Sequence, residues 1–341
     1  MTRTARRRWS REYGARVDGI AFGPEGPVLV HGYDAPAGGK WIDDVIPGKL
    51  AALDRNTGEI LWNAPCEVGY GRGFGAGFGA LGHAVVLGPS QGSHRAVRMS
   101  MVDGELLESA DIPAFDQAHV AEDLCLCLSA GRVFAIDSHA LQETWEYSRE
   151  GERYHHVVRA GDRALIVFSS RATGRAGVLV LDAETGSFEE LLVRPGLPVI
   201  HGAVASADAL VLLAAELETI LPAARQAELA SAIALHEGGG SRDTLSLVGL
   251  RLDGRSGDDP LWFQVLETRP VDELPEVSIS ADSGKLYVEH GALLEARDAM
   301  TGRPLGDWTV PGLDEQIVWQ VADGAGLLAE ESRVSVFELP A

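Results

Sequence analysis

The chain has few cysteines, and this excludes two ways of stabilising a small fold. Three cysteines among 341 residues supply neither a disulfide framework nor a four-ligand zinc site. Cys125 and Cys127 lie two residues apart on a predicted strand, so we expect both thiols to face one side and to pack as small hydrophobes. Hydrophobic residues make up 45% of the chain, which leaves ample material for an apolar core.

Positive charge is also scarce. Lysine and arginine number 29 against 50 aspartates and glutamates, which gives a formal charge of −21. Such a surface repels phosphate backbones and anionic lipids, so we expect neither nucleic acid nor a membrane as a partner. The one basic cluster consists of Arg3, Arg6, Arg7 and Arg8. We interpret it as a terminus attracted to its own acidic protein, with a nucleic-acid arm as the alternative.

Long apolar runs are missing. No stretch approaches the roughly 18 apolar residues of a membrane-spanning helix, and the first 30 residues contain no signal-peptide core. We therefore expect a cytoplasmic protein, or one whose leader has been removed.

Glycine is abundant, at 40 residues, which favours many tight turns between short strands. The segment 48–62 contains an apolar strand, an Asp-x-x-Thr-Gly turn and a second strand ending in Trp62. It predicts a hairpin in which the glycine adopts the left-handed conformation while the aspartate and threonine bond the turn backbone. The turn occurs three times, as Asp54, Thr57 and Gly58; as Asp182, Thr185 and Gly186; and as Asp298, Thr301 and Gly302.

Degenerate copies of this hairpin fill the intervals. Aspartates at 54, 103, 137, 182, 253 and 298 are separated by 49, 34, 45, 71 and 45 residues, and the long step contains an insertion of about 27 residues. Two further strands precede each hairpin, so the repeat has four strands, and units of this period stack radially. The sequence thus predicts an all-β fold, a seven-bladed β-propeller forming one domain over 1–341, with blades at 15–65, 70–112, 115–148, 153–194, 198–268, 274–310, and 315–339 plus 8–13.

The last blade takes its strands from both ends of the chain. Residues 315–339 supply three strands, and residues 8–13 match the end of a repeat. We expect this N-terminal strand to complete the blade and so to remove an exposed sheet edge.

The pattern Leu-Asp-x-x-Thr-Gly-x-x-x-Trp, complete at 53–62 and partial in other blades, resembles the repeat of the PQQ-like (quinoprotein alcohol dehydrogenase-like) β-propeller family. The resemblance implies the fold more than a function, because the family contains quinoprotein dehydrogenases, outer-membrane assembly lipoproteins and propellers without cofactor. Its PQQ enzymes carry an adjacent cysteine pair and an acidic calcium site. The sequence shows neither, so we expect no PQQ and no other cofactor, with a divalent metal as the alternative.

Histidines support that alternative. His119, His155, His156 and His201 lie near the beginnings of the first strands of three successive blades. If their side chains converged at the channel mouth, they would bind a divalent metal. The other reading is that each is a separate polar residue bonded to backbone or water.

Two insertions between second and third strands emerge on one face of the predicted propeller. The first, 33–47, contains Trp41 and Ile42. The second, 216–242, contains a predicted helix over 217–236, with Thr219 as a candidate N-cap. The helix would be a lid, a docking element or a surface decoration. The predicted partner-binding residues on these insertions are Trp41, Ile42, Leu217, Leu221, Leu229 and Ile233.

No Gly-x-Ser-x-Gly or His-Glu-x-x-His motif occurs. The sequence therefore favours a non-catalytic scaffold that binds another protein through its helix- and loop-decorated face. The alternative is a metal-dependent lyase or hydrolase acting on a small polar substrate at the channel mouth.

Overall fold

The structure is a computed structural model that describes residues 3–22, 26–34, 46, 48–71, 73–90, 92–121, 123–195, 199–206, 208–215, 221–235, 244–252, 260–268, 277–316 and 318–339. The chain divides into two compact units. One contains Thr4–Tyr147, Glu184–Gly186 and Val310–Ala341, and the other contains Met1–Arg3, Ser148–Ala183 and Ser187–Thr309.

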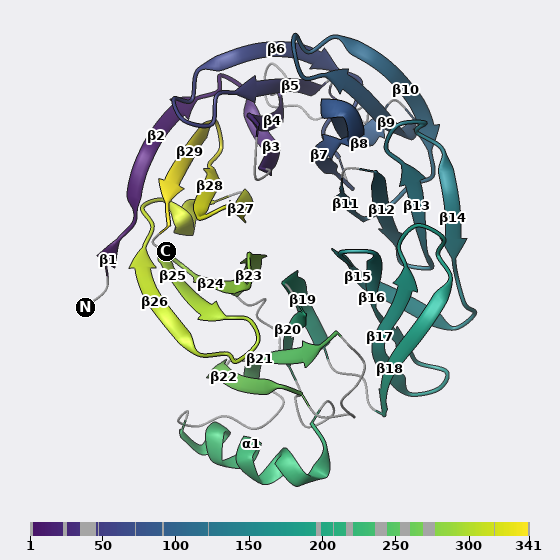
Figure 1. Ribbon diagram of the computed structural model, residues 1–341, viewed down its shortest axis with the longest axis vertical. Coiled ribbons are helices and arrows are strands. Elements are labelled where there is room, and N and C mark those ends of the chain that lie inside the picture. The colour runs from purple at the N-terminus through teal and green to yellow at the C-terminus, as the bar shows by residue number, and fades with distance from the viewer. Residues whose placement is uncertain are drawn as a thin grey trace. The chain divides into compact units, whose positions relative to one another are not determined.

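Seven antiparallel sheets give the chain the seven-bladed β-propeller fold with four-stranded blades that the repeats predict (Figure 1). Four of the sheets belong to the first unit. In chain order their strands are β2 (Arg6–Glu12), β3 (Arg16–Phe22), β4 (Val28–Tyr33), β5 (Gly48–Leu53), β6 (Ile60–Cys66), β7 (Gly75–Gly79), β8 (His83–Ser90), β9 (Ser93–Ser100), β10 (Leu106–Ile112), β11 (Gln117–Val120), β12 (Leu124–Ser129), β13 (Arg132–Asp137), β14 (Glu143–Tyr147), β27 (Val318–Ala322), β28 (Ala325–Ala329) and β29 (Arg333–Glu338). Short 3₁₀ turns occur at η2 (Ala80–Gly82) and η5 (Leu313–Glu315).

The other three sheets belong to the second unit. Their strands are β15 (Glu152–Ala160), β16 (Arg163–Ser170), β17 (Arg175–Asp182), β18 (Phe188–Pro195), β19 (Val199–Ser206), β20 (Ala209–Ala215), β21 (Thr244–Arg251), β22 (Trp262–Thr268), β23 (Val277–Asp282), β24 (Lys285–His290), β25 (Leu293–Asp298) and β26 (Pro304–Thr309). The two-residue strand β1 (Arg3–Thr4) lies on the outer edge of β26. Helix α1 (Ala223–Leu235) joins β20 to β21 in blade five.

Each blade is a simple meander whose first strand lies innermost. Within the first unit the first strands of successive blades touch in the order β27, β3, β7 and β11, and within the second unit β15 touches β19 and β19 touches β23. The second and third strands are packed on both faces by neighbouring blades. Strands such as β4 and β28 are therefore buried along their whole length, which explains their continuous apolar sequences.

The N-terminal strand completes the last blade, as predicted. β2 pairs antiparallel with β29, with Trp9 opposite Val336 and Arg11 opposite Val334. The strand begins at Arg6, two residues before the predicted start, so the basic cluster contributes directly to this pairing. Arg6 and Arg8 form ion pairs with Glu338.

The third and fourth strands are joined by the repeated turn. Asp54 Oδ1 accepts hydrogen bonds from the backbone N–H of Asn56 (2.9 Å) and Thr57 (2.8 Å) and from the Thr57 hydroxyl (3.0 Å). Hydrogen bonds from Thr57 and Asn56 lower the pKa of the Asp54 carboxyl. Asp298 makes the same bonds to Thr301, at 2.8 Å from both the backbone nitrogen and the hydroxyl. In the three complete copies the glycine has a positive φ, at Gly58 (73°), Gly186 (67°) and Gly302 (69°).

In the described part of the chain, no helix is both long and apolar enough to cross a membrane.

Candidate functional site

The repeated turn and its tryptophan form a contact between successive blades. Trp62, on the outer strand of blade one, donates its Nε1–H to the Met101 carbonyl in the turn of blade two, at 2.9 Å. Its ring covers Gly104, where a Cβ atom would lie 2.5 Å from the ring. Trp9 packs in the same way on Gly58 and bonds Arg55 O (2.8 Å). In the second unit, Trp262 packs on Gly302 and bonds Ala299 O (2.9 Å). The repeat motif is therefore structural.

These contacts also correct the register assumed for blade two. The backbone N–H of Gly104 bonds Ser100 O (3.0 Å), as that of Gly58 bonds Asp54 O (2.8 Å). Ser100 therefore occupies the position of the repeat aspartate, which the sequence-based spacing had assigned to Asp103. The substitution of serine for aspartate hid the register.

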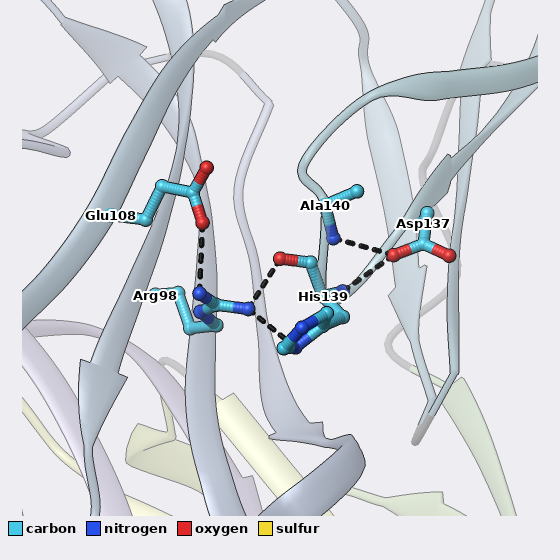
Figure 2. A network of polar contacts seen from close by, with 5 residues as sticks. All are labelled: Arg98, Glu108, Asp137, His139 and Ala140. Carbon is cyan, nitrogen blue, oxygen red and sulfur yellow. Dashed lines mark hydrogen bonds and ion pairs between the residues drawn. The ribbon is translucent and has the colours of Figure 1, made fainter.

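Blade two meets the turn of blade three through a different, polar contact (Figure 2). Glu108 occupies the position of the repeat tryptophan, four residues after Gly104. Arg98 bonds Glu108 (2.8 Å), and its other terminal nitrogen bonds both the ring Nδ1 (2.6 Å) and the backbone carbonyl of His139. Asp137 orders that turn by accepting the backbone N–H groups of His139 and Ala140.

The turn of blade three also departs from the repeat pattern. Leu141 replaces the repeat glycine, retains a positive φ of 51° and is buried. Without a tryptophan ring on top of it, a side chain at this position has room. Arg98 and Leu141 together therefore replace the tryptophan and glycine found at the three junctions described above.

At the end of blade one opposite its 54–58 turn lies a buried charged cluster. It is made of Asp18, His31, Cys66 and Val68, and we call it the loop-end cluster. His31 is fully buried on β4. Its Nδ1 lies 2.5 Å from Asp18 Oδ1, and its Nε2 lies 2.9 Å from Val68 O. Both partners accept hydrogen bonds, so both ring nitrogens donate and the ring is an imidazolium.

The electrostatics of His31 agree with this assignment. Burial alone lowers the pKa of the imidazole, but hydrogen bonds to Asp18 and Cys66 outweigh it and raise the pKa to about 10. The ring also lies against Phe74, with centroids 4.7 Å apart. Val68 belongs to the linker between blades one and two, and the next residue donates its backbone N–H to Pro89 O (2.8 Å) on β8. The cluster thus connects the two blades through their linker.

Beside this cluster lies an exposed aromatic surface, which we call the Tyr70 surface and define by Tyr33, Asp34, Ile46, Lys49 and Tyr70. The Tyr33 and Tyr70 rings have centroids 4.5 Å apart. Tyr33 is buried, whereas Tyr70 is 45% exposed. Lys49 Nζ lies 2.6 Å from Asp34 Oδ2, and the Tyr70 backbone N–H bonds Ile46 O at 3.3 Å. Asp34 and Ile46 flank residues 35–45 in sequence, which include Trp41 and Ile42.

Trp41, Ile42 and Leu217 lie outside the described residues. Leu221 and Leu229 are buried in the core shared by blades four and five, and Ile233 is partly buried against the same core. Helix α1 is shorter than expected, beginning at Ala223 after Pro222.

Helix α1 packs on its own blade, against the outer strand β22 (Figure 1). The Arg225 guanidinium lies 4.9 Å from the Phe263 ring centroid and bonds Pro260 O (2.8 Å). Leu221, Leu229 and Ile233 belong to the same apolar cluster as side chains of β21 and β22.

Two of the histidines predicted as candidate metal ligands make different hydrogen bonds. In the second unit, His155 Nε2 lies 2.7 Å from Ser169 Oγ on β16, and His156 Nε2 lies 3.4 Å from Ile200 O on β19, beside His201. Burial lowers the pKa of all three imidazoles, and the neighbouring His156 lowers that of His155 further. His119 lies exposed on β11 of the first unit. Over the described ranges, no three His, Cys, Asp or Glu side chains are placed to hold a metal.

The sequence and the fold were compared with known proteins. A family model described as outer membrane protein assembly factor BamB matches residues 47–194, which include the complete turns at 54–58 and 182–186. Over these residues the repeats are similar to those of the PQQ-like β-propeller family. The chain is similar to BamB from Moraxella catarrhalis (13% identity, 98% of this chain and 97% of that chain covered, TM-score 0.48). It is also similar to the Dos1 propeller (8% identity, 98% and 95% covered, TM-score 0.57). No curated protein matches the sequence.

The described residues do not fit a quinone cofactor. Cys125 and Cys127 are fully buried and pack with Phe134 and Ile136 in the core shared by blades two and three. Burial raises the pKa of the Cys127 thiol well above its ordinary value. The thiols therefore line no cofactor site, and the described carboxylates form no metal-binding group.

Proposed function

We propose that this PQQ-like propeller is a non-catalytic scaffold that binds another protein, and that the Tyr70 surface with the adjoining 35–45 segment is the contact. The described polar clusters support a structural role for most of the chain. The hydrogen bonds of the Asp turns order the turns themselves, and those of the Arg98 network and the loop-end cluster connect neighbouring blades.

The observation that carries the proposal is the exposure of Tyr70 on a fixed base. Tyrosine offers a large apolar contact and a polar hydroxyl at a small cost in side-chain entropy, and it is enriched at the centres of protein interfaces. Tyr70 is held from below by the Tyr33 ring and by its backbone bond to Ile46. Trp41 and Ile42 are apolar residues of the sequence between Asp34 and Ile46. Loops on a rigid scaffold commonly bind partners.

The test is affinity capture with the immobilised full chain from an extract of its source cells. We expect a discrete bound protein that is lost when Tyr70→Ala is combined with Trp41→Ala and Ile42→Ala. The melting temperature should stay unchanged, because Tyr70 is exposed and residues 41 and 42 belong to the insertion between β4 and β5 in sequence. The captured protein is then purified, and its affinity for each variant is measured by titration calorimetry.

Leu61→Ala is the matched control, since Leu61 is an exposed apolar residue at the opposite end of the same blade. Tyr70→Phe is the conservative variant, and it should retain most of the affinity because the ring remains. Equal binding by the triple variant and the wild type would overturn the proposal.

A further inference from the structure

The outer strand of a propeller blade leaves one edge unpaired within its sheet, and such edges recruit foreign strands unless they are protected. Most outer strands of this chain carry a recognisable protection. β2 has four arginines and β6 contains Pro65, β14 has only five residues, β22 packs against α1, and β26 is covered by β1.

Strand β10 lacks these protections. Its seven residues include no proline, lysine or arginine. Its first two side chains, Leu106 and Leu107, are 44% and 43% exposed, and Val102 at the tip of the preceding turn is 88% exposed. The bulge between Leu106 and Glu108 does not distinguish β10, because the third and fourth strands of every blade show a register shift near this point.

Acidic side chains frame this apolar edge. Asp103 and Glu105 are exposed, and Glu108 is bonded to Arg98. Hydrogen bonds from Ser100 and from the Glu105 backbone lower the pKa of the Asp103 carboxyl, so this group stays charged near neutral pH. Two copies of β10 brought edge to edge would place like charges together, which is unfavourable. A cationic strand would instead complement the carboxylates.

The chain itself contains an example of this arrangement. In the second unit, β1 begins with Arg3 and adds to the outer edge of β26 as a fifth strand. It comes from the basic N-terminal segment. The outer edge of this blade therefore pairs with a short segment of the basic N-terminus, while its four strands keep the order seen in the other blades.

We propose that the outer edge of β10 is a docking site for an extended, cationic segment of a partner protein, which adds to blade two as a fifth strand. Main-chain hydrogen bonds supply the affinity in this mode, and alternate side chains supply the specificity. Apolar residues of the segment contact Leu106, Leu107 and Val102, and its lysines or arginines face Asp103 and Glu105. The site is distinct from the Tyr70 surface, so either proposal can fail without the other.

The experiment uses the full chain and a labelled probe, an acetylated and amidated peptide of alternating lysine and valine, with alternating glutamate and valine as the charge control. Fluorescence anisotropy at low salt should show saturable binding of the lysine peptide only. Leu107→Lys places a cation on the edge and should weaken binding by about tenfold. Leu61→Lys, at the same position of blade one, should leave it unchanged.

Hydrogen exchange distinguishes strand addition from loose electrostatic attraction. The lysine peptide should slow amide exchange in residues 106–112 of the wild type, and an analogue N-methylated at alternate residues should not. Equal binding by Leu107→Lys and the wild type, or no change in exchange at 106–112, would overturn the proposal. So would a dimer of the wild type that Leu107→Lys converts to monomer, because a second copy would then cover this edge.

Discussion

The two ends of blade one are joined to blade two by opposite kinds of chemistry. At the turn end, Trp62 covers Gly104 and donates one hydrogen bond to Met101 O. At the loop end, the buried imidazolium of His31 bridges Asp18 and the linker carbonyl of Val68. The first contact depends on shape and apolar burial, and the second depends on a proton. Truncating the contact side chain at either end should therefore lower the stability of the protein, whereas only the contact at the loop end should depend on pH.

The largest expected effect comes from removing the tryptophan. Trp62→Ala deletes a buried indole from the core of blades one and two and should lower the free energy of unfolding by about 4 kcal/mol. Chemical denaturation followed by circular dichroism measures this loss. The loss should be the same at pH 6 and pH 9, since no titrating group takes part. A strongly pH-dependent loss would contradict the view that the contact at the turn end is independent of protonation.

Removing the imidazolium should lower the free energy of unfolding slightly less. His31→Ala leaves the partly buried Asp18 carboxylate without its partner, and we expect a loss of about 3 kcal/mol near pH 6. Denaturation with urea, analysed for a constant m-value, checks this figure. A loss within the error of the wild-type measurement would mean that the pair contributes nothing.

The pH dependence of the wild type sharpens the contrast. The folded pKa of His31, about 10, lies above its unfolded value of roughly 6.5, so folding binds a proton in this range. The contribution of His31 is complete below about pH 6.5 and declines as the pH rises towards 10. Stability measured from pH 6 to pH 10 should fall more steeply in the wild type and in Trp62→Ala than in His31→Ala. Parallel curves for the wild type and His31→Ala would contradict the ion pair.

A smaller effect is expected from glycine substitution at the turn end. Gly104→Ala forces a Cβ into the Trp62 ring at a positive φ of 74° and should cost about 2 kcal/mol. Gly92 is the matched control, because it has the same φ of 74° but no heavy atom within 4 Å of the point that a Cβ would occupy. Gly92→Ala should lower the free energy of unfolding by about 1 kcal/mol, because only backbone strain is added. Equal losses for the two variants would show that the tryptophan contact is not tight.

The smallest effect is expected at the junction of blades two and three. Arg98→Met removes the bonds to Glu108 and His139 but keeps an apolar side chain of similar length, so we expect a loss of about 1 kcal/mol. Added salt should reduce the stability difference between the wild type and Arg98→Met, because salt screens the pair of Arg98 and Glu108. Thermal melting of both proteins at low and high salt provides the measurement.

The sequence alone predicts much of this fold because the repeat is carried by local rules. Asp54, Thr57 and Gly58 specify a turn by themselves, and three copies of that turn set the period of the blades. The strand at Arg6–Glu12 was also predictable, since a propeller with three terminal strands needs a fourth.

The loop-end cluster was missed because its members are distant in sequence and belong to different strands. The only signal was His31 itself, a single polar residue within the apolar strand Val28–Tyr33. The junction of blades two and three carried a better signal. Glu108 stands at the tryptophan position of blade two, and Leu141 stands at the glycine position of the next turn. Read together, the two substitutions indicate an exchanged contact, whereas each alone appears as random degeneracy.

The proposed binding of a partner through the loop end of blade one can be tested by site-specific photo-crosslinking in the source cells, with a benzoylphenylalanine residue placed at position 70 or, as the control, at position 61. We predict a discrete crosslinked product of one partner protein from position 70 and none from position 61. The same product from both positions, or none from position 70, would contradict the claim.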